Sequence, residues 1–239
     1  MNKENENKKA VKHEAPMSAR EISEVFLNPV SGLYDRGWGL TFLRKGVEDG
    51  DPLCMVRLAD VLLSEEHTEE ERKEALAALE KAIKKNYAPA YTMLGGLYLA
   101  GKEVKKDVPL ALSYYESAAK RKNLAALISL AEIYSKGEDT PKDITKAESY
   151  YRKACKLCDP SIVFVLAVPF AKLLVSHPKE DKKATKEAEE ILLPLVRKHK
   201  KNGEVAYLLG EVFTREDNTS RAKAYFAKAK SLGVTELKD

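Results

Sequence analysis

The chain has 239 residues, of which 44% are hydrophobic and 33% are charged. The helix-favouring residues Ala, Leu, Glu and Lys dominate and few segments alternate like strands, so we predict an all-α protein. The net charge of +4 is too small to require nucleic acid or an anionic membrane as a partner, and no apolar run approaches the roughly 20 residues of a membrane-spanning helix.

The first 16 residues are charged and lack the apolar core of a secretion signal. We therefore expect a disordered tail over 1–16, on a cytoplasmic protein. The three cysteines, Cys54, Cys155 and Cys158, are an odd number in a chain that shows no export signal. Free thiols are expected for this reason, and no disulfide framework.

A repeat of 36 residues begins directly after this tail. The block LGGLY at 94–98 recurs as LAEIY at 130–134, as LADVL at 58–62 and as ISEVF at 22–26. In each block the apolar residues fall four positions apart, which is the spacing of one helix face. A fixed period of this length indicates stacked structural repeats.

A second block keeps the same step. ALSYYESAA from Ala111 aligns with AESYYRKAC from Ala147 and with ALAALEKAI from Ala75, and looser copies of both blocks follow Asp159. Each repeat therefore consists of two helices. The predicted repeats lie at about 17–50, 51–86, 87–122, 123–158, 159–202 and 203–235, within one domain over 17–239.

Residues that begin and end helices stand where this arrangement requires them. Asp107, Asp143 and Asn218 precede the second helices and are suited to cap them. Gly101 and Gly137 follow the first helices and are suited to end them in the left-handed conformation. Local chemistry and periodicity thus predict the same helix boundaries.

This pattern resembles the Sel1-like repeat family, whose members are relatives of the tetratricopeptide repeats. The matching residues are Ala90, Leu94, Gly95, Tyr98, Gly101, Val104, Asp107, Ala111, Tyr114, Tyr115, Ala118 and Ala119. The resemblance covers about residues 17–235. It implies a right-handed α-solenoid of about six helix-turn-helix repeats, which holds protein partners on a concave face lined by the first helices.

The 36-residue step predicts which residues lie on that concave face. The first row is Val56, Thr92, Ile128, Phe164 and Tyr207, the adjoining row is Asp60, Gly96, Glu132, Val168 and Glu211, and Leu63 and Leu99 extend them. An apolar strip beside separated carboxylates suits a basic or amphipathic peptide. For Ile128 and Phe164, packing against the next repeat is an equally good interpretation.

One string looks like a nucleotide site. Residues 96–102 read G-x-x-x-x-G-K, which is seven of the eight positions of a P-loop. The segment between the glycines is predicted to be the end of a helix, so its N–H groups are not free to surround phosphates. Glu103 also replaces the Ser or Thr that would hold Mg²⁺, and we expect no nucleotide and no other cofactor.

Two further short sequences resemble a metal site and a nucleic-acid site. Cys155 and Cys158 form a C-x-x-C, but no second pair of ligands accompanies them, so thiols at a helix end are expected, with no metal site. The basic run 197–201 falls in the last turn of a helix, where it complements the helix dipole, and no nucleic-acid partner is expected. No catalytic residue is predicted.

The main hypothesis is a non-enzymatic adaptor or scaffold that binds partner peptides or helices. Two alternatives stay open at this point, namely a small-ligand-binding or weakly catalytic Sel1-like protein of the β-lactam type, and an organelle assembly factor. Pro169 and Pro194 lie inside predicted helices and bend or break them. A joint there could shape a binding pocket or absorb strain.

Overall fold

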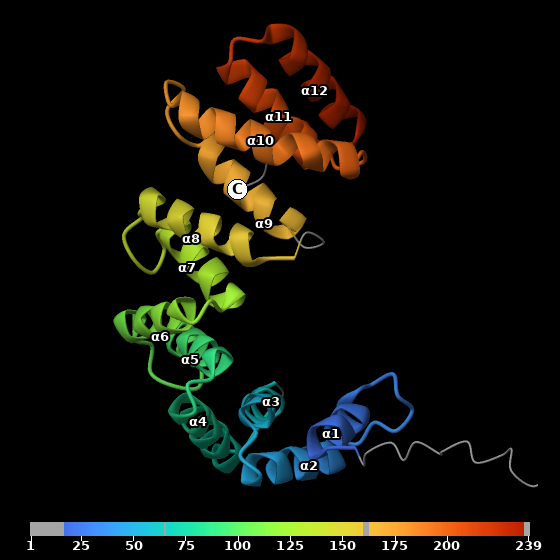
Figure 1. Cartoon of the computed structure of the whole chain (residues 1–239), viewed down its shortest axis with the longest axis vertical. Helices are drawn as coiled ribbons and strands as arrows, with labels where there is room; N and C mark the ends of the chain where they lie inside the picture. Colours follow the sequence, from blue (N-terminus) through green and yellow to red (C-terminus); the bar gives the residue numbers. More distant parts are fainter. Residues whose placement is uncertain (1–16, 65, 160–162, 237–239) are drawn as a thin grey trace, which may run out of the picture. The chain divides into compact units, whose positions relative to one another are not determined.

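The computed structural model describes residues 17–64, 66–159 and 163–236. Across these ranges it holds twelve α-helices and no strand, which confirms the predicted all-α class (Figure 1). The helices divide between an N-terminal unit, up to Ala90, and a C-terminal unit, from Tyr91 onward. The predicted tail over 1–16 lies outside the described residues.

The N-terminal unit holds the first four helices, each of which packs on the next. They are α1 (Ala19–Leu27), α2 (Arg36–Glu48), α3 (Pro52–Leu63) and α4 (Glu69–Lys84). Leu43, Leu58, Leu62 and Leu79 fill the space between them and are almost completely buried. Such burial stabilises the unit by about 1.5–3 kcal/mol for each side chain.

The C-terminal unit begins within the first turn of α5 and includes all helices up to α12. Its helices are α5 (Ala88–Ala100), α6 (Val108–Lys120), α7 (Leu124–Lys136), α8 (Ile144–Leu157), α9 (Val163–Val175), α10 (Lys182–Lys198), α11 (Gly203–Arg215) and α12 (Thr219–Ser231). From α6 onward each helix packs on the next, and α9 also contacts α11. The helices thus follow one another as helix-turn-helix pairs.

The predicted helix boundaries are confirmed by the cap geometry. The side chains of Asp107, Asp143 and Asn218 each accept a hydrogen bond from the backbone N–H three residues later. Gly101 and Gly137 have φ values of 70° and 74°, in the left-handed region that glycine adopts without strain. The cap residues therefore satisfy N–H groups that the first turn leaves unpaired.

Small residues allow the two helices of a pair to approach closely. A Cβ atom at Gly95 would lie 3.0 Å from the Tyr115 ring, and one at Gly210 would lie 2.6 Å from the Phe226 ring. Larger side chains at these positions would push the helices apart, which typically costs about 1–3 kcal/mol. The repeated small residue in the first helix is thus a packing requirement.

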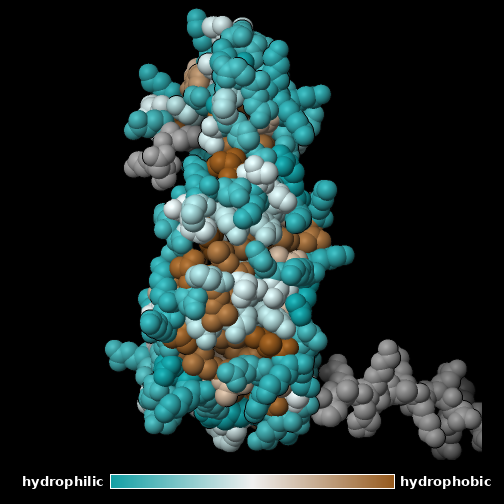
Figure 2. Space-filling view, turned by 90° about the vertical axis from the view of Figure 1, so that its left-hand side faces the viewer, coloured by the Kyte–Doolittle hydropathy of each residue, from teal (hydrophilic) through white to brown (hydrophobic). Residues whose placement is uncertain are grey.

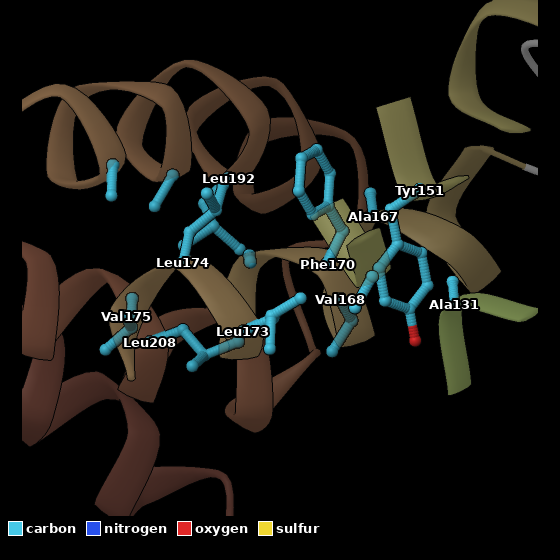
Figure 3. Close-up of a cluster of buried hydrophobic side chains, with 14 of the residues drawn as sticks. Ala131, Tyr151, Ala167, Val168, Phe170, Leu173, Leu174, Val175, Leu192 and Leu208 are labelled. Atoms are coloured by element: carbon cyan, nitrogen blue, oxygen red, sulfur yellow. The ribbon is translucent and has the colours of Figure 1, made fainter. Parts of the chain in front are cut away.

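The core of the C-terminal unit surrounds α9, which contacts α8, α10 and α11. Most of its side chains are buried, and Figure 3 shows Leu174 beside Leu192 of α10 and Leu173 near Leu208 of α11. The predicted positions of Pro169 and Pro194 inside helices are confirmed, in α9 and α10. A helix that is apolar on nearly all sides must be enclosed by its neighbours.

The last helix pair closes this core with a polar surface. Charged side chains of α12 such as Lys223 and Lys230 are exposed. On the face shown in Figure 2, the upper end of the molecule, where Figure 1 places α11 and α12, is predominantly hydrophilic. A polar outer face on a terminal repeat is what keeps a repeat stack from associating at its end.

Candidate functional site

Two adjoining hollows mark the surface of the C-terminal unit. The larger, which we call the α9 groove, has a volume of about 620 Å³. It is lined by Glu132, Ser135, Lys136, Tyr151, Phe164, Val165, Val168, Pro169, Lys172, Leu173, Ser176 and Glu204. The smaller, the α7 groove, has a volume of about 270 Å³ and is lined by Leu99, Tyr115, Ser129, Glu132, Ile133, Lys136, Glu138 and Asp139. Glu132 and Lys136 line both hollows, so the two form one continuous surface.

The wall that α9 gives to its groove is apolar. Val165 is 68% exposed, although most of its neighbours in the helix are buried. Phe164 is half-buried and its ring lies 4.5 Å from the imidazole ring of His199. Val168 is 7% exposed and lies beside Tyr151, whose hydroxyl is turned away from Phe170 (Figure 3). An exposed valine in a hollow is a surface that gains free energy when a ligand covers it.

Pro169 changes the backbone of the same wall. Proline has no N–H, so residue 169 cannot donate the helical hydrogen bond to the carbonyl of Val165, one turn earlier. Both residues line the α9 groove. Pro169 thus belongs to the apolar wall, whereas Pro194 is exposed on α10 and lines neither hollow.

Glu132 lies on the wall that the two hollows share, and its side chain is exposed. Tyr115 and Tyr151 occupy equivalent positions of successive repeats. The phenols of both interact electrostatically with the carboxylate of Glu132. Burial, reinforced by the carboxylate of Glu132, raises the pKa of Tyr151 to about 12 and also raises the pKa of Tyr115. Hydrogen bonds to Ser135 and Ser129 act in the opposite direction. Both phenols therefore stay neutral at physiological pH.

The charged residues of the two hollows are unequally compensated. Lys172 pairs with Glu204 of α11 at 3.1 Å, and Lys106, outside the hollows, pairs with Asp139 at 2.7 Å. The lining carboxylates are Glu132, Glu138, Asp139 and Glu204, and the lining ammonium groups are Lys136 and Lys172. The lining is therefore acidic, which favours cationic ligands.

Four of the residues predicted for the concave face come together in these hollows. Glu132, Phe164 and Val168 line the α9 groove, and Leu99 lines the α7 groove. Gly96 lies next to them, because a Cβ atom there would be 3.4 Å from the Tyr115 hydroxyl. The two predicted rows thus meet in one place within the C-terminal unit.

Other predicted residues of this unit are used in packing. Thr92 donates a hydrogen bond to the Asn123 side chain at 3.1 Å, and that side chain caps α7. Ile128 is half-buried and packs against a small apolar cluster that includes Leu127. For Ile128 the packing interpretation is therefore the one that its contacts favour.

Tyr207 and Glu211 lie on α11 and line neither hollow. The Tyr207 ring meets Phe226 edge to face at 5.2 Å, and both Tyr207 and Glu211 are half-buried. Burial, followed by the charge of Glu211, raises the pKa of the Tyr207 phenol. These contacts stabilise the last helix pair.

Val56, Asp60 and Leu63 belong to the N-terminal unit and line neither hollow. Val56 and Leu63 are half-buried. Asp60 is exposed but pairs with Arg57 at 2.8 Å, and Arg57 also pairs with Glu24. Its carboxylate is therefore already compensated within its own unit.

Several groove residues were not among those predicted. Val165, Lys172 and Leu173 share α9 with Phe164, so a search of the whole helix face would have included them. Tyr151 stands in the second helix of its repeat, and the predicted rows used first helices only. Glu204 comes from α11, which follows a lengthened repeat and breaks the 36-residue step.

The P-loop-like sequence, the C-x-x-C and the basic run all lie at the ends of helices. α5 ends at Ala100 and Gly101 follows it, so the P-loop-like string lies mostly inside a helix, as predicted. Cys155 and Cys158 are free thiols at the end of α8, and burial raises the pKa of Cys155 to about 11. The basic run 197–201 begins in the last turn of α10 and continues past its end.

Two absences concern the described part of the chain. Residues 17–64, 66–159 and 163–236 contain no group of three or more histidine, cysteine or acidic side chains placed to hold a metal ion. Among the described helices, none combines the length and the apolar character needed to cross a membrane.

A polar network lies directly behind the α9 groove. His177 follows the groove residue Ser176, and its two ring nitrogens lie 2.5 Å from Glu148 Oε1 and 3.0 Å from Asp181 Oδ2. Arg152 donates to Glu148 at 2.9 Å and to Glu187 at 2.7 Å. Arg152 thus joins α8 to α10, and the connection between α9 and α10 is joined to the start of α10 by the hydrogen bond between His177 and Asp181. His177 Nε2 and Glu148 Oε1 are in close contact without a hydrogen bond.

Arg215 of α11 fixes the same connection from its other side. Its guanidinium donates to the backbone carbonyls of Val175, His177 and Pro178. The carbonyl of Val175 ends α9 and those of His177 and Pro178 follow it. One planar guanidinium with several N–H groups can serve all three, although the Pro178 carbonyl also accepts from the N–H of Asp181. The end of α9 that borders the groove is therefore held by α8, α10 and α11.

Asp181 gives this network a dependence on pH. The backbone N–H of Ala184, and then His177, hold the pKa of the Asp181 carboxyl below its usual value of 3.8. A lowered pKa in the folded state stabilises the fold above about pH 4 and loses that contribution as the pH falls further. We expect Asp181→Asn to lower the melting temperature near neutral pH, with a deficit that shrinks toward about pH 3.

Melting curves recorded by circular dichroism between about pH 7 and about pH 3 measure this deficit. Asparagine still caps α10, so the comparison isolates the charge. Asp107→Asn is the matched exchange at the cap of α6, where the side chain likewise accepts from the backbone N–H three residues later, and it measures the cost of the exchange itself. A deficit for Asp181→Asn that is constant over the whole range would contradict the assignment.

The comparison with protein families matches the helix pairs that form the α7 groove. The family model for the Sel1 repeat matches residues 88–123, 124–157 and 203–234. The first two matches cover α5 to α8, and the third covers α11 and α12. No curated protein matches the chain.

Solved structures share the fold at low sequence identity. A Sel1 repeat protein from Oxalobacter formigenes is 18% identical, with a TM-score of 0.63 over 89% of this chain and 86% of its own. The protective antigen c5321 of uropathogenic Escherichia coli, which displays an SLR fold, is 17% identical, with a TM-score of 0.64 over 90% of this chain and 46% of its own. YrrB, a TPR protein with an unusual peptide-binding site, is 19% identical, with a TM-score of 0.56 over 80% of this chain and 91% of its own.

The matched repeats, the helix pairs and these structures agree with one another. At such identities the likeness to solved structures shows the fold alone, which is that of a Sel1-type α-solenoid. Folds of this class commonly serve as protein-interaction scaffolds and are typically non-enzymatic. The chain thus carries three Sel1 repeats within an all-helical repeat fold.

Proposed function

We propose that the chain is a non-enzymatic adaptor whose C-terminal unit binds a segment of a partner protein in the α9 groove. The observation that carries this proposal is the exposed apolar wall of that groove, where Val165 is 68% exposed at the edge of a buried helix. Apolar surface in a hollow is the usual basis of peptide binding by helical repeats.

The rigidity of the groove supports the same proposal. Its α9 wall is part of the main core, and the end of α9 is held by Arg215 and by the network around His177. A wall that is already formed by packing and hydrogen bonds lowers the entropic cost of binding. YrrB, a TPR protein of similar fold, has an unusual peptide-binding site, which supports a peptide as the ligand here.

The experiment is a selection of peptides by the full chain. A phage-displayed library of random twelve-residue peptides is panned against the immobilised protein, and the enriched peptides are synthesised and titrated. Val165→Glu places a carboxylate on the apolar wall, and we expect it to weaken binding by at least about tenfold, which is ~1.4 kcal/mol.

The matched control is Val30→Glu, at a valine that is 89% exposed in the N-terminal unit. Both substitutions replace an exposed valine, so both variants should keep the helicity and the melting temperature of the unchanged chain. We expect Val30→Glu to bind the peptides normally. Equal binding by all three proteins, or no enriched peptide at all, would remove the α9 groove as a binding site.

We also propose the cytoplasm as the compartment, because all three cysteines are free thiols and Cys54 is buried. Unpaired cysteines of this kind are typical of reducing compartments. Imaging of a fluorescent fusion of the full chain in its own cells tests this, and a signal confined to an organelle or to the medium would contradict it.

A further inference from the structure

We infer that the segment bound in the α9 groove places a lysine or arginine side chain at Glu132, between the phenols of Tyr115 and Tyr151. This inference rests on the proposed function and specifies the chemistry of the partner. It follows from the residues that line the two hollows beside Glu132, from the charge of that lining and from the apolar wall.

Glu132 has the position of an anchoring group. Its carboxylate is exposed on the wall shared by the α9 and α7 grooves. Within the described residues no ion pair includes it, although Lys136 lies one turn later on the same helix and lines both hollows. A carboxylate with no cationic partner can gain one from a ligand without breaking an existing pair.

The phenols of Tyr115 and Tyr151 supply hydrogen-bond acceptors for a cation bound at Glu132. Both tyrosines are buried, and burial together with the charge of Glu132 keeps their phenols neutral. A neutral phenol supplies a hydroxyl oxygen that accepts a hydrogen bond from an ammonium or guanidinium group. Tyr151 lines the α9 groove, Tyr115 lines the α7 groove and Glu132 lines both, so a cation bound at Glu132 has a phenol in each adjoining hollow.

The remaining charges of the lining point the same way. Lys172 neutralises Glu204 and Lys106 neutralises Asp139, so Glu132 and Glu138 remain as carboxylates of the lining against the ammonium group of Lys136. Glu138 adds a second exposed carboxylate near Glu132. An acidic segment would meet this excess negative charge, whereas a basic segment would be attracted by it.

The apolar end of the groove supplies the second contact. Val165, Val168 and Leu173 form a wall that an aliphatic or aromatic side chain of the ligand can cover. The partner is thus a segment with an apolar anchor for this wall and a basic residue for Glu132.

The test extends the peptide selection described above. The most enriched peptide is synthesised with its basic residue and with norleucine in that place, which keeps the alkyl stem and removes the charge. Both are titrated by fluorescence anisotropy into the unchanged chain, into Glu132→Gln, and into Glu190→Gln as a control at an exposed carboxylate on α10. A second selection uses Glu132→Lys as the target.

We expect norleucine to weaken binding to the unchanged chain and to Glu190→Gln by about fivefold, as for a partly exposed ion pair. On Glu132→Gln the two peptides should bind alike, and Glu132→Lys should enrich acidic residues at the same position of the peptide. Enriched peptides without a basic position, or an equal norleucine effect on Glu132→Gln, would overturn the inference. If Val165→Glu still abolishes binding in that case, the proposed function stands while this inference falls.

Discussion

Replacement of Phe213 by alanine is expected to lower the free energy of unfolding by about 3–5 kcal/mol. Phe213 is completely buried in α11, its ring stacks on Tyr225 at 5.4 Å, and the guanidinium of Arg221 lies 3.9 Å from the ring centroid. Removal of the ring loses its burial and leaves a cavity that three neighbouring helices can fill only in part. Urea unfolding followed by far-ultraviolet circular dichroism measures the loss.

The same substitution one helix later is the control. Phe226 of α12 is half-buried, and its ring contacts Tyr207 and covers Gly210. Phe226→Ala should therefore cost about 1–2 kcal/mol, because part of the Phe226 side chain is already in contact with water. Equal losses for the two variants would show that burial does not set the cost at these positions.

The helices and their boundaries could be predicted from the sequence because their causes are local. The Asp107 and Asp143 caps act within one turn, and Gly137 ends α7 through its own backbone conformation. Gly95, one of the residues that match the repeat pattern, meets the ring of Tyr115, and Gly210 meets the ring of Phe226 in the same way. A period of 36 residues carries the same reasoning from one helix pair to the next.

The candidate site could be predicted only in part, because periodicity identifies a helix face but not what covers it. Glu132, Phe164 and Val168 were predicted and line the α9 groove. Thr92 and Ile128 have the same register, yet the first hydrogen-bonds to the cap of α7 and the second packs into an apolar cluster. Whether a residue of a row is free or covered depends on the neighbouring helix, which the row does not describe.

The network behind the groove could not be predicted at all. His177 lies in the connection after α9, Glu148 on α8 and Asp181 at the start of α10, so their spacing in the sequence follows no repeat. Their contact depends on how the lengthened fifth helix pair folds back on its neighbour. Only the three-dimensional arrangement shows that these ionisable groups belong together.

This network is also expected to contribute strongly to the stability of the fold. We expect Arg152→Met to lower the free energy of unfolding by about 2–3 kcal/mol, somewhat below the cost of opening a fully buried ion pair. Arg152 neutralises both Glu148, which is 8% exposed, and Glu187, and methionine removes the charge but keeps much of the stem. Two carboxylates would then face each other with only His177 near one of them. Urea unfolding of the unchanged chain and the variant measures the difference.

Arg44→Met separates the effect of burial from the loss of an ion pair. Arg44 also holds a carboxylate with two hydrogen bonds, since Nε and one terminal nitrogen both lie 2.8 Å from the oxygens of Glu74. The side chains of that pair are 45% and 35% exposed, so its loss should cost no more than about 1 kcal/mol. The double variant with Arg152→Met and Glu148→Gln should recover part of the larger loss, because it removes the buried carboxylate that the arginine neutralised. If Arg152→Met cost no more than Arg44→Met, water would be compensating Glu148 as well as the arginine does, and the connection after α9 would not depend on these charges.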